Sequence, residues 1–179
     1  HPPYGATEAV PVISIGSREI LSETGRLSEQ GHGICIGIPL NGISVQIIKI
    51  TDDPINEWSD DIIAADGEAG EITVKGDLVT RQYFENPEAD ALSKIKDGTG
   101  FRHRMGDLGR KDEKERIWFL GRKSHRVIKS DGTLFTIPCE AIFNNHPEVF
   151  RSALVGIGKK PNQTPVICIE SESGVNTDE

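Results

Sequence analysis

The segment FRHRMGDLGRKDEKERIWFLGRKSHRVIK, residues 101–129, carries the pattern around which we interpret the rest of the chain. It contains Asp107 between two glycines and a Gly121-Arg122 pair, and a polar stretch and a short apolar run at 117–120 separate the two. An aromatic-rich run bounded by turn residues is typical of a buried strand. The segment therefore predicts a hairpin that brings Asp107 and Arg122 together at one end of a sheet.

The chemistry of this pair suits a sugar phosphate. A carboxylate accepts hydrogen bonds from neighbouring hydroxyls, and a guanidinium can donate two hydrogen bonds to phosphate or carboxylate oxygens. Asp107 and Arg122 are therefore candidate ligands of a ribose phosphate. Spacing alone also allows a surface ion pair beside a tight glycine turn.

The charge balance narrows the classes of partner. The chain has 179 residues and a formal net charge of −8, from 28 acidic and 20 basic side chains. Nucleic acids and anionic membrane surfaces are bound mainly through Lys and Arg, so we expect neither as a partner. No apolar run approaches the roughly 20 residues that span a bilayer. We therefore expect no membrane span.

The cysteines predict a reducing compartment. Cys35, Cys139 and Cys168 are far apart, odd in number and form no CxxC pair, and the five histidines show no zinc-ligand spacing. Such a pattern is typical of a cytoplasmic protein with reduced thiols.

Short alternating stretches predict strands in the first two thirds of the chain. Residues 43–50 and 71–76 alternate apolar and polar side chains, and the glycine-rich residues 31–42 disfavour a helix. A short helix is expected from Pro87, whereas the polar residues 17–30 are expected to be irregular. Several short strands between glycine-rich turns predict a small, distorted β-barrel subdomain.

A different pattern follows Gly121. Residues 130–132, Ser-Asp-Gly, predict a second hairpin turn, and Pro138 predicts the start of a helix. Two further strands are expected at 153–157 and 166–169. This order predicts a small α+β unit, so the expected fold class of the whole chain is mixed α/β.

Six short motifs occur along the chain in the order in which one enzyme superfamily has them. They are YGATE at 4–8, GEITVKG at 70–76, YFENPEA at 83–89, HRMGDL at 103–108, Gly121-Arg122, and Pro138 with Glu140. Together they resemble the adenylate-forming superfamily, which includes acyl-CoA synthetases, the adenylation domains of peptide synthetases, and luciferases. Each motif alone is weak, and their common order makes the resemblance strong.

Within this superfamily, the chain most resembles the β-lactone synthetases of bacterial olefin biosynthesis, a group of AMP-dependent synthetases and ligases. The segments that carry this likeness are 103–107, 121–127, 143–147 and 151–158. The resemblance implies that ATP activates a small-molecule carboxylate as an acyl-adenylate, with Mg²⁺ as the metal. In the lactone subgroup, it implies that the β-hydroxyl of a long-chain substrate then attacks the activated carboxyl.

The resemblance also implies a domain organisation. Residues 1–121 would be the end of the large AMP-binding domain, with the nucleotide motif and the β-barrel subdomain. Residues 122–179 would be the hinge and the first part of the small α+β C-terminal lid domain. The family's phosphate loop would lie upstream of His1, and its catalytic lysine downstream of Glu179. We therefore expect a fragment of a longer ligase, inactive in isolation.

The resemblance assigns nucleotide contacts to the first motif. Tyr4 and the adjacent Gly5 would contact the nucleotide, with the Tyr4 ring stacked on adenine. Thr7 would contact phosphate and Glu8 would hold Mg²⁺, a role that suits a hard oxygen ligand, and both are candidate catalytic residues. The residues alone equally allow Tyr4 in a core and Thr7-Glu8 at a helix N-terminus.

The second half of the site and the hinge follow from the later motifs. Asp107 would bind the ribose hydroxyls, and Arg122 would neutralise phosphate or ribose charge. Ser124 occupies the hinge position, where the family has Asp or Lys, and Ile128 stands in place of a family lysine. These departures argue against CoA as a second substrate and favour the lactone reaction. We expect Ser124 to lie in an exposed connector that few contacts cross.

Three alternatives stay open. The parent protein could be a fatty-acyl-CoA synthetase that forms the CoA thioester, a non-catalytic nucleotide-binding module, or a purely structural β-barrel domain. The presence of Thr7, Glu8, Asp107 and Arg122 favours an active parent enzyme.

Overall fold

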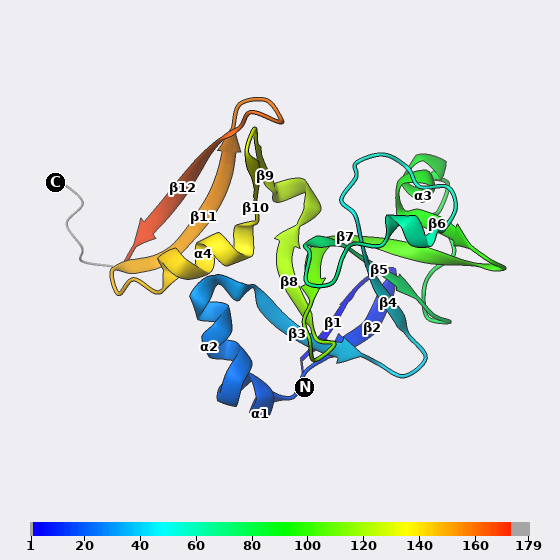
Figure 1. Ribbon diagram of the computed structural model, residues 1–179, viewed down its shortest axis with the longest axis horizontal. Helices are drawn as coiled ribbons and strands as arrows, with labels where there is room; N and C mark the ends of the chain where they lie inside the picture. The colour runs from blue at the N-terminus through cyan, green and yellow to red at the C-terminus, as the bar shows by residue number, and fades with distance from the viewer. Residues whose placement is uncertain (1, 173–179) are drawn as a thin grey trace.

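One open antiparallel sheet dominates the computed structural model, which describes residues 2–172 (Figure 1). Its strands follow the order β1-β2-β3-β8-β7-β5-β4, and β6 pairs with β7. The strands are β1 (Pro3–Ala6), β2 (Ala9–Ser14), β3 (Ile34–Pro39), β4 (Ser44–Ile48), β5 (Gly70–Lys75), β6 (Lys94–Asp97), β7 (Gly100–Lys111) and β8 (Ile117–Arg122). The long β7 therefore connects most of the sheet.

The sheet does not close, so the prediction of a distorted β-barrel is wrong in this respect. β1 and β4 stand at the two ends of the strand order and do not pair with each other within the described residues. The outer edge of β4 is hydrogen-bonded by the loop that follows it. Lys49 N donates to Ile62 O at 2.8 Å, and Ala64 N donates to Ile47 O at 3.0 Å. Because this loop satisfies the backbone groups that a closing strand would need, the sheet ends at β4.

The apolar side chains of the alternating strands β4 and β5 form part of the hydrophobic core, as predicted. Ile72 and Val74 of β5 are fully buried and belong to one hydrophobic cluster with Ile47 of β4 and Met105 of β7. Glu71, on the opposite face of β5, is buried as well. Both faces of this strand are therefore covered, which allows a charged side chain to be enclosed beneath the sheet.

Residues 17–32 are helical, although the sequence predicted an irregular segment there. The run comprises α1 (Ser17–Glu19), η1 (Ile20–Thr24), α2 (Gly25–Leu27) and η2 (Ser28–His32). Ile20 and Leu27 pack against the cluster around Trp118, and Thr24 is buried between them. The spacing of these three side chains places them on one face of a helix. The polar residues between them obscured this pattern in the sequence.

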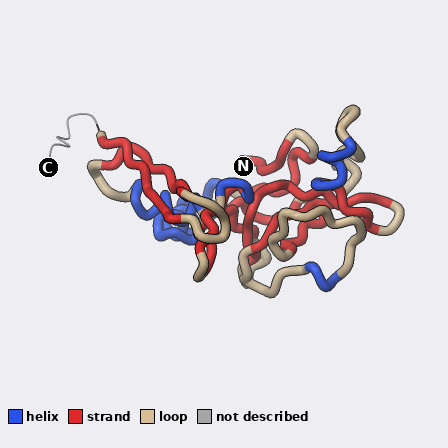
Figure 2. The backbone as a smooth tube through the Cα atoms, turned by 90° about the horizontal axis from the view of Figure 1, so that it is seen from above, coloured by secondary structure: helices blue, strands red, loops and turns tan. Residues whose placement is uncertain are grey.

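A smaller group of elements follows β8. It comprises η4 (Lys123–His125), the hairpin of β9 (Val127–Lys129) and β10 (Gly132–Leu134), α4 (Thr136–Asn144), and the antiparallel pair β11 (Val149–Ile157) and β12 (Thr164–Ser171). The predicted hairpin, helix and two strands are confirmed, although α4 begins at Thr136, before Pro138. The β11–β12 pair lies to one side of the large sheet (Figures 1 and 2). The mixed α/β class is therefore confirmed.

Two short helices complete the described chain. They are η3 (Asp60–Ile62) and α3 (Pro87–Ser93). α3 begins at Pro87 as predicted, and the Asn86 side chain caps it by accepting a hydrogen bond from Ala89 N at 3.1 Å. Between residues 2 and 172, no helix is long and apolar enough to cross a membrane.

Replacement of a core side chain should destabilise the sheet. Ile72→Ala should lower the apparent free energy of unfolding by about 3 kcal/mol, because it leaves a cavity in a fully buried cluster. Chemical denaturation of the full-length protein measures the change. Leu21→Ala is the control, since the Leu21 side chain is exposed and its loss should have little effect. Equal losses in the two variants would contradict this description of the core.

Candidate functional site

The predicted hairpin brings Asp107 and Arg122 together. The two residues are direct partners in the antiparallel pairing of β7 with β8. Arg122 Nη1 lies 2.9 Å from Asp107 Oδ1, and the Tyr4 hydroxyl donates a hydrogen bond to Asp107 Oδ2 at 2.6 Å. Tyr4 of β1 and Arg122 of β8 therefore converge on the Asp107 carboxylate of β7.

The Asp107 carboxylate has one oxygen left to accept a hydrogen bond. Its side chain is only 9% exposed, and Oδ1 accepts no hydrogen bond within the described structure. Arg122 Nη1 forms an ion pair with this oxygen and also donates a hydrogen bond to Met105 O at 3.3 Å. Oδ1 therefore has the charge of Arg122 beside it but accepts no hydrogen bond, so an incoming hydroxyl donor at Oδ1 would be favourable.

Burial governs the titration of this group. Burial raises the pKa of Asp107 above the ordinary value, and the hydrogen bond from Tyr4 and the charge of Arg122 oppose that rise. Burial and the adjacent carboxylate raise the pKa of the Tyr4 phenol, so Tyr4 stays a hydrogen-bond donor. Arg122 is 55% exposed, which leaves its guanidinium free to meet an anion from solvent.

Two glycines beside the site have backbone angles that other residues rarely adopt. They are Gly106 and Gly121, with φ angles of +66° and +119°. The β7–β8 register also shifts between Leu108 and Gly109. A Cβ on Gly121 would collide with the Thr136 hydroxyl, so this glycine also lets the first turn of α4 pack against the end of β8.

Thr7 and Glu8 form the turn between β1 and β2, rather than a helix N-terminus. Thr7 is exposed, and Glu8 Oε1 accepts a hydrogen bond from the Tyr83 hydroxyl at 2.8 Å. The backbone of Glu8 is held as well, because its carbonyl accepts from Thr80 N at 2.9 Å. Lys94 Nζ donates to Thr80 O at 2.6 Å, which places a cation beside this turn. No hydrogen bond links this group to Asp107 within the described residues.

The Glu8 carboxylate is ionised at neutral pH. Burial opposes its ionisation, but the hydrogen bond from Tyr83 and the nearby positive groups prevail and leave its pKa below the ordinary value. In the part of the chain that the structure describes, no three His, Cys, Asp or Glu side chains cluster as a metal site. Mg²⁺ is commonly held by one or two carboxylates together with substrate phosphates, so a single Glu8 fits such an ion.

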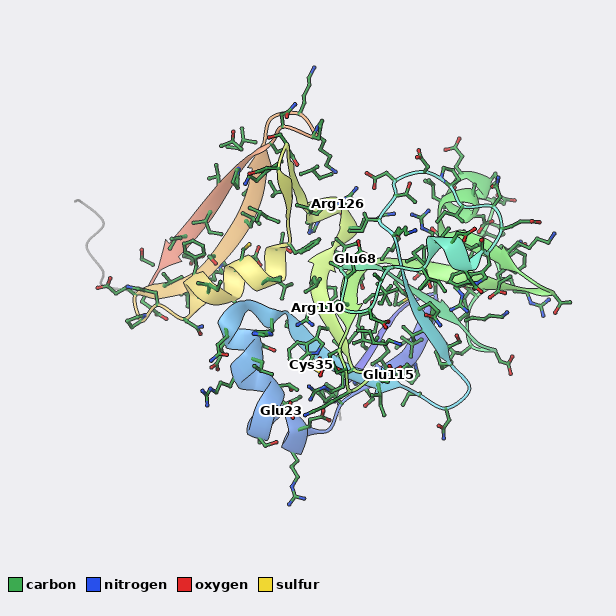
Figure 3. The ribbon with its side chains drawn as sticks, viewed as in Figure 1. Glu23, Cys35, Glu68, Arg110, Glu115 and Arg126 are labelled. Atoms are coloured by element: carbon green, nitrogen blue, oxygen red, sulfur yellow. The ribbon has the colours of Figure 1, made fainter. Side chains whose placement is uncertain are left out.

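The predicted hinge is exposed at Ser124 but is crossed by polar contacts. Arg126 Nη2 lies 2.6 Å from Asp52 Oδ2, and Asn145 Nδ2 donates to Glu29 O at 2.6 Å. Arg126 stands at the junction of the sheet and the C-terminal elements (Figure 3). The expectation that few contacts cross this connector is therefore wrong for this conformation.

Sequence reasoning gave no role to Tyr83, although it lies in one of the quoted motifs. Its hydroxyl meets Glu8 from a position 75 residues away along the chain. Spacing cannot reveal such a contact, because the loop between β5 and α3 sets the direction of the Tyr83 side chain. The motif itself was the only signal in the sequence.

Comparison with known proteins tests the resemblance. No family model matches the chain. The olefin β-lactone synthetase of Xanthomonas campestris is 46% identical over 178 residues, which cover 97% of this chain and 32% of that protein. The resemblance to the adenylate-forming enzymes is confirmed. The 2-succinylbenzoate–CoA ligase of Geobacillus kaustophilus is 34% identical over 117 residues, covering 65% of this chain and 23% of that ligase.

Solved structures share the fold. The O-succinylbenzoate coenzyme A synthetase of Bacillus subtilis, in complex with AMP, has a TM-score of 0.74 at 23% identity, over 98% of this chain and 32% of that one. The amide bond synthetase of Marinactinospora thermotolerans has a TM-score of 0.74 at 21% identity, over the same shares. The chain therefore spans about a third of the length of these adenylate-forming relatives.

Loss of the Tyr4 hydroxyl should raise the pKa of Asp107 further. In Tyr4→Phe the carboxylate loses a donor that favours its ionised form, while the burial that raises its pKa remains. Less of Asp107 should then be ionised at mildly acidic pH. Carbon NMR of the labelled carboxyl group follows the titration, with Tyr83→Phe as a control for a hydroxyl lost elsewhere. An unchanged titration in Tyr4→Phe would contradict the importance of this contact.

Proposed function

We propose that the chain is part of an AMP-forming ligase that activates a carboxylic acid as an acyl-adenylate. The observation that carries this proposal is the Asp107 carboxylate, buried between Tyr4 and Arg122 with one oxygen left to accept a hydrogen bond. A ribose hydroxyl is a donor of the required kind. The names of the curated relatives support the reaction class, since they are synthetases and ligases.

Each site residue has a part in this proposal. Asp107 accepts a hydrogen bond from the ribose, and the exposed Arg122 guanidinium faces the phosphate charge. Tyr4 is held by its hydroxyl on Asp107 and packs against the core beside Phe119, and the part of its ring left open would stack on the adenine. Gly5 lets the backbone of β1 approach Ala9 of β2 closely. Thr7 lies exposed at the hairpin turn, where its hydroxyl can donate to a phosphate oxygen.

Glu8 is proposed to hold Mg²⁺. Its ionised carboxylate is fixed through one oxygen by Tyr83, and this orients the group before the ion arrives. The metal, when bound, neutralises charge on the ATP phosphates. A solved structure of the Bacillus subtilis relative holds ATP and a magnesium ion, which supports the same pairing here.

The domain assignment is part of the same proposal. Residues 1–121 are the end of the large AMP-binding domain, and residues 122–179 are the hinge at Ser124 and the start of the C-terminal lid. Rotation about Ser124 would require the Arg126–Asp52 ion pair to break. We place the protein in the cytoplasm, in accordance with its free cysteines.

We favour a long-chain β-hydroxy acid as substrate and a β-lactone as product. The carboxylate oxygen attacks the α-phosphorus of ATP and releases pyrophosphate. The β-hydroxyl oxygen then bonds to the acyl carbon, the acyl–phosphate bond breaks, AMP leaves and the hydroxyl proton passes to solvent. The 46% identity to an olefin β-lactone synthetase supports this product. The second candidate is the CoA thioester, supported by 31% identity over 155 residues to a long-chain-fatty-acid–CoA ligase of Salmonella typhimurium.

Product analysis of the full-length protein tests this choice. The protein is incubated with ATP, Mg²⁺ and a long-chain β-hydroxy acid or the unsubstituted acid of equal length, with and without CoA. We expect AMP and a β-lactone from the hydroxy acid without any need for CoA. A thioester from both acids would favour the second candidate, and absence of pyrophosphate exchange with either acid would contradict the ligase proposal.

Substitution of Asp107 should harm adenylation more than substitution of Arg122. Asp107→Ala removes the hydrogen bond to the ribose, at roughly 1–3 kcal/mol, which lowers the rate of ATP–pyrophosphate exchange about 100-fold. Arg122→Lys keeps the charge but loses the planar guanidinium that can donate two hydrogen bonds to one anion, and it should lower the rate about tenfold. Exchange assays on the full-length variants measure both rates. Wild-type exchange in Asp107→Ala would refute the ribose contact.

A further inference from the structure

A buried carboxylate lies under the sheet close to the candidate site. Glu71 of β5 and Arg104 of β7 are each 1% exposed, and Arg104 Nη2 and Nε lie 2.7 and 3.0 Å from Glu71 Oε2. Arg104 also donates to Thr51 O at 2.6 Å and Asp53 O at 2.8 Å. This network joins two strands to the loop that follows β4. No step of the proposed reaction uses it.

Lys123 extends this network to the end of β8. Its Nζ lies 3.0 Å from Glu71 Oε2 and 3.1 Å from Thr51 O, and its side chain is only 17% exposed. Burial of an ammonium group is costly unless it is paired, so these contacts hold the side chain in place. Lys123 directly follows Arg122, the last residue of β8, and opens η4.

The end of β8 is held by its pairing with β7, by the first turn of α4 packed on Gly121, and by the ion pair of Arg122 with Asp107. Gly121 has a positive φ, and the pairing with β7 is irregular between Leu108 and Gly109. Arg122 stands at the last paired position, and 55% of its side chain is exposed. The last residue of a strand nevertheless opens more readily than residues at its centre. The ion pair of the next residue is therefore well placed to fix the position of Arg122.

We propose that Lys123 is a positioning residue: its ion pair with the buried Glu71 holds the end of β8 so that Arg122 stays beside Asp107. The proposal rests on the proposed function, since it concerns the nucleotide site formed by Asp107 and Arg122. Arg126 reinforces the arrangement, because its Nη1 donates to Lys123 O at 2.6 Å. The role of Lys123 differs from that of Arg122, because its side chain points beneath the sheet and acts through its neighbour.

Binding of AMP to the full-length protein tests this role without any need for turnover. Lys123→Met removes the charge, keeps most of the side-chain length and leaves the Glu71–Arg104 pair intact, whereas a Glu71 variant would leave the buried Arg104 without its carboxylate partner. In calorimetric titrations, we expect Lys123→Met to bind AMP about tenfold more weakly than wild type, because the contact that positions Arg122 is lost. Lys123→Arg keeps the positive charge and should bind AMP within about twofold of wild type. Lys96→Met is the control, since Lys96 pairs with Glu57 in an exposed ion pair.

A mutant cycle separates positioning from general stabilisation. In an Arg122→Ala background, Lys123→Met should have no further effect on AMP binding, because the group that it positions is gone. Equal weakening in both backgrounds would overturn the proposal, as would wild-type binding by Lys123→Met. If Lys123→Met fails to fold, Lys123→Gln takes its place in the same cycle.

Asp107→Ala distinguishes failure of this inference from failure of the proposed function. If Asp107→Ala weakens AMP binding while Lys123→Met does not, the nucleotide site is supported and the positioning role of Lys123 is refuted. If Asp107→Ala leaves AMP binding unchanged, the nucleotide site itself is refuted, and the positioning role with it.

Discussion

The antiparallel pairing of β7 with β8 is the constraint on which the rest of the site depends. It sets Asp107 directly opposite Arg122, although a turn of polar residues separates them in the chain. The same β7 carries Arg104 and Met105, which face the buried ion network and the hydrophobic core. A shift of this register by one residue would exchange the two faces of the strand and remove the site and the core together. Fold and candidate function therefore rest on the same backbone hydrogen bonds.

Local patterns predicted most elements but not the way in which the sheet ends. Alternation of apolar and polar residues predicted β4 and β5, and the Asp131-Gly132 turn predicted the β9–β10 hairpin. Both are local patterns, because the residues that form each pattern lie within a few positions of one another. Closure of a barrel depends on which segment reaches the outer edge of β4. That edge is taken by the loop through Ala64, a contact with no local signal. The helix at 17–32 was missed because the side chains on its buried face, among them Ile20, Thr24 and Leu27, are separated by polar residues.

The sequence predicted those residues of the candidate site that lie in recognisable motifs. The contact of Asp107 with Arg122 followed from the hairpin, and the resemblance supplied Tyr4 and Glu8. The supporting residues could not be inferred, since Tyr83 reaches Glu8 across the fold and Lys123 reaches Glu71 across β7. A buried ion pair adds little net stability compared with apolar packing, but it fixes the geometry of the groups that it joins. We therefore interpret the Glu71 network as fixing the positions of the side chains that it joins, rather than as adding stability.

The central claim is that the open oxygen of Asp107 receives a ribose hydroxyl. The most direct test compares the affinities of AMP and 2′,3′-dideoxy-AMP for the full-length protein and for Asp107→Ala. We predict that wild type binds the dideoxy nucleotide about 100-fold more weakly than AMP, because the buried Asp107 Oδ1 is then left without a hydrogen-bond donor, and that Asp107→Ala binds the two within about threefold of one another. An equal preference for AMP in both proteins would contradict the account, because the hydroxyls would then be recognised elsewhere.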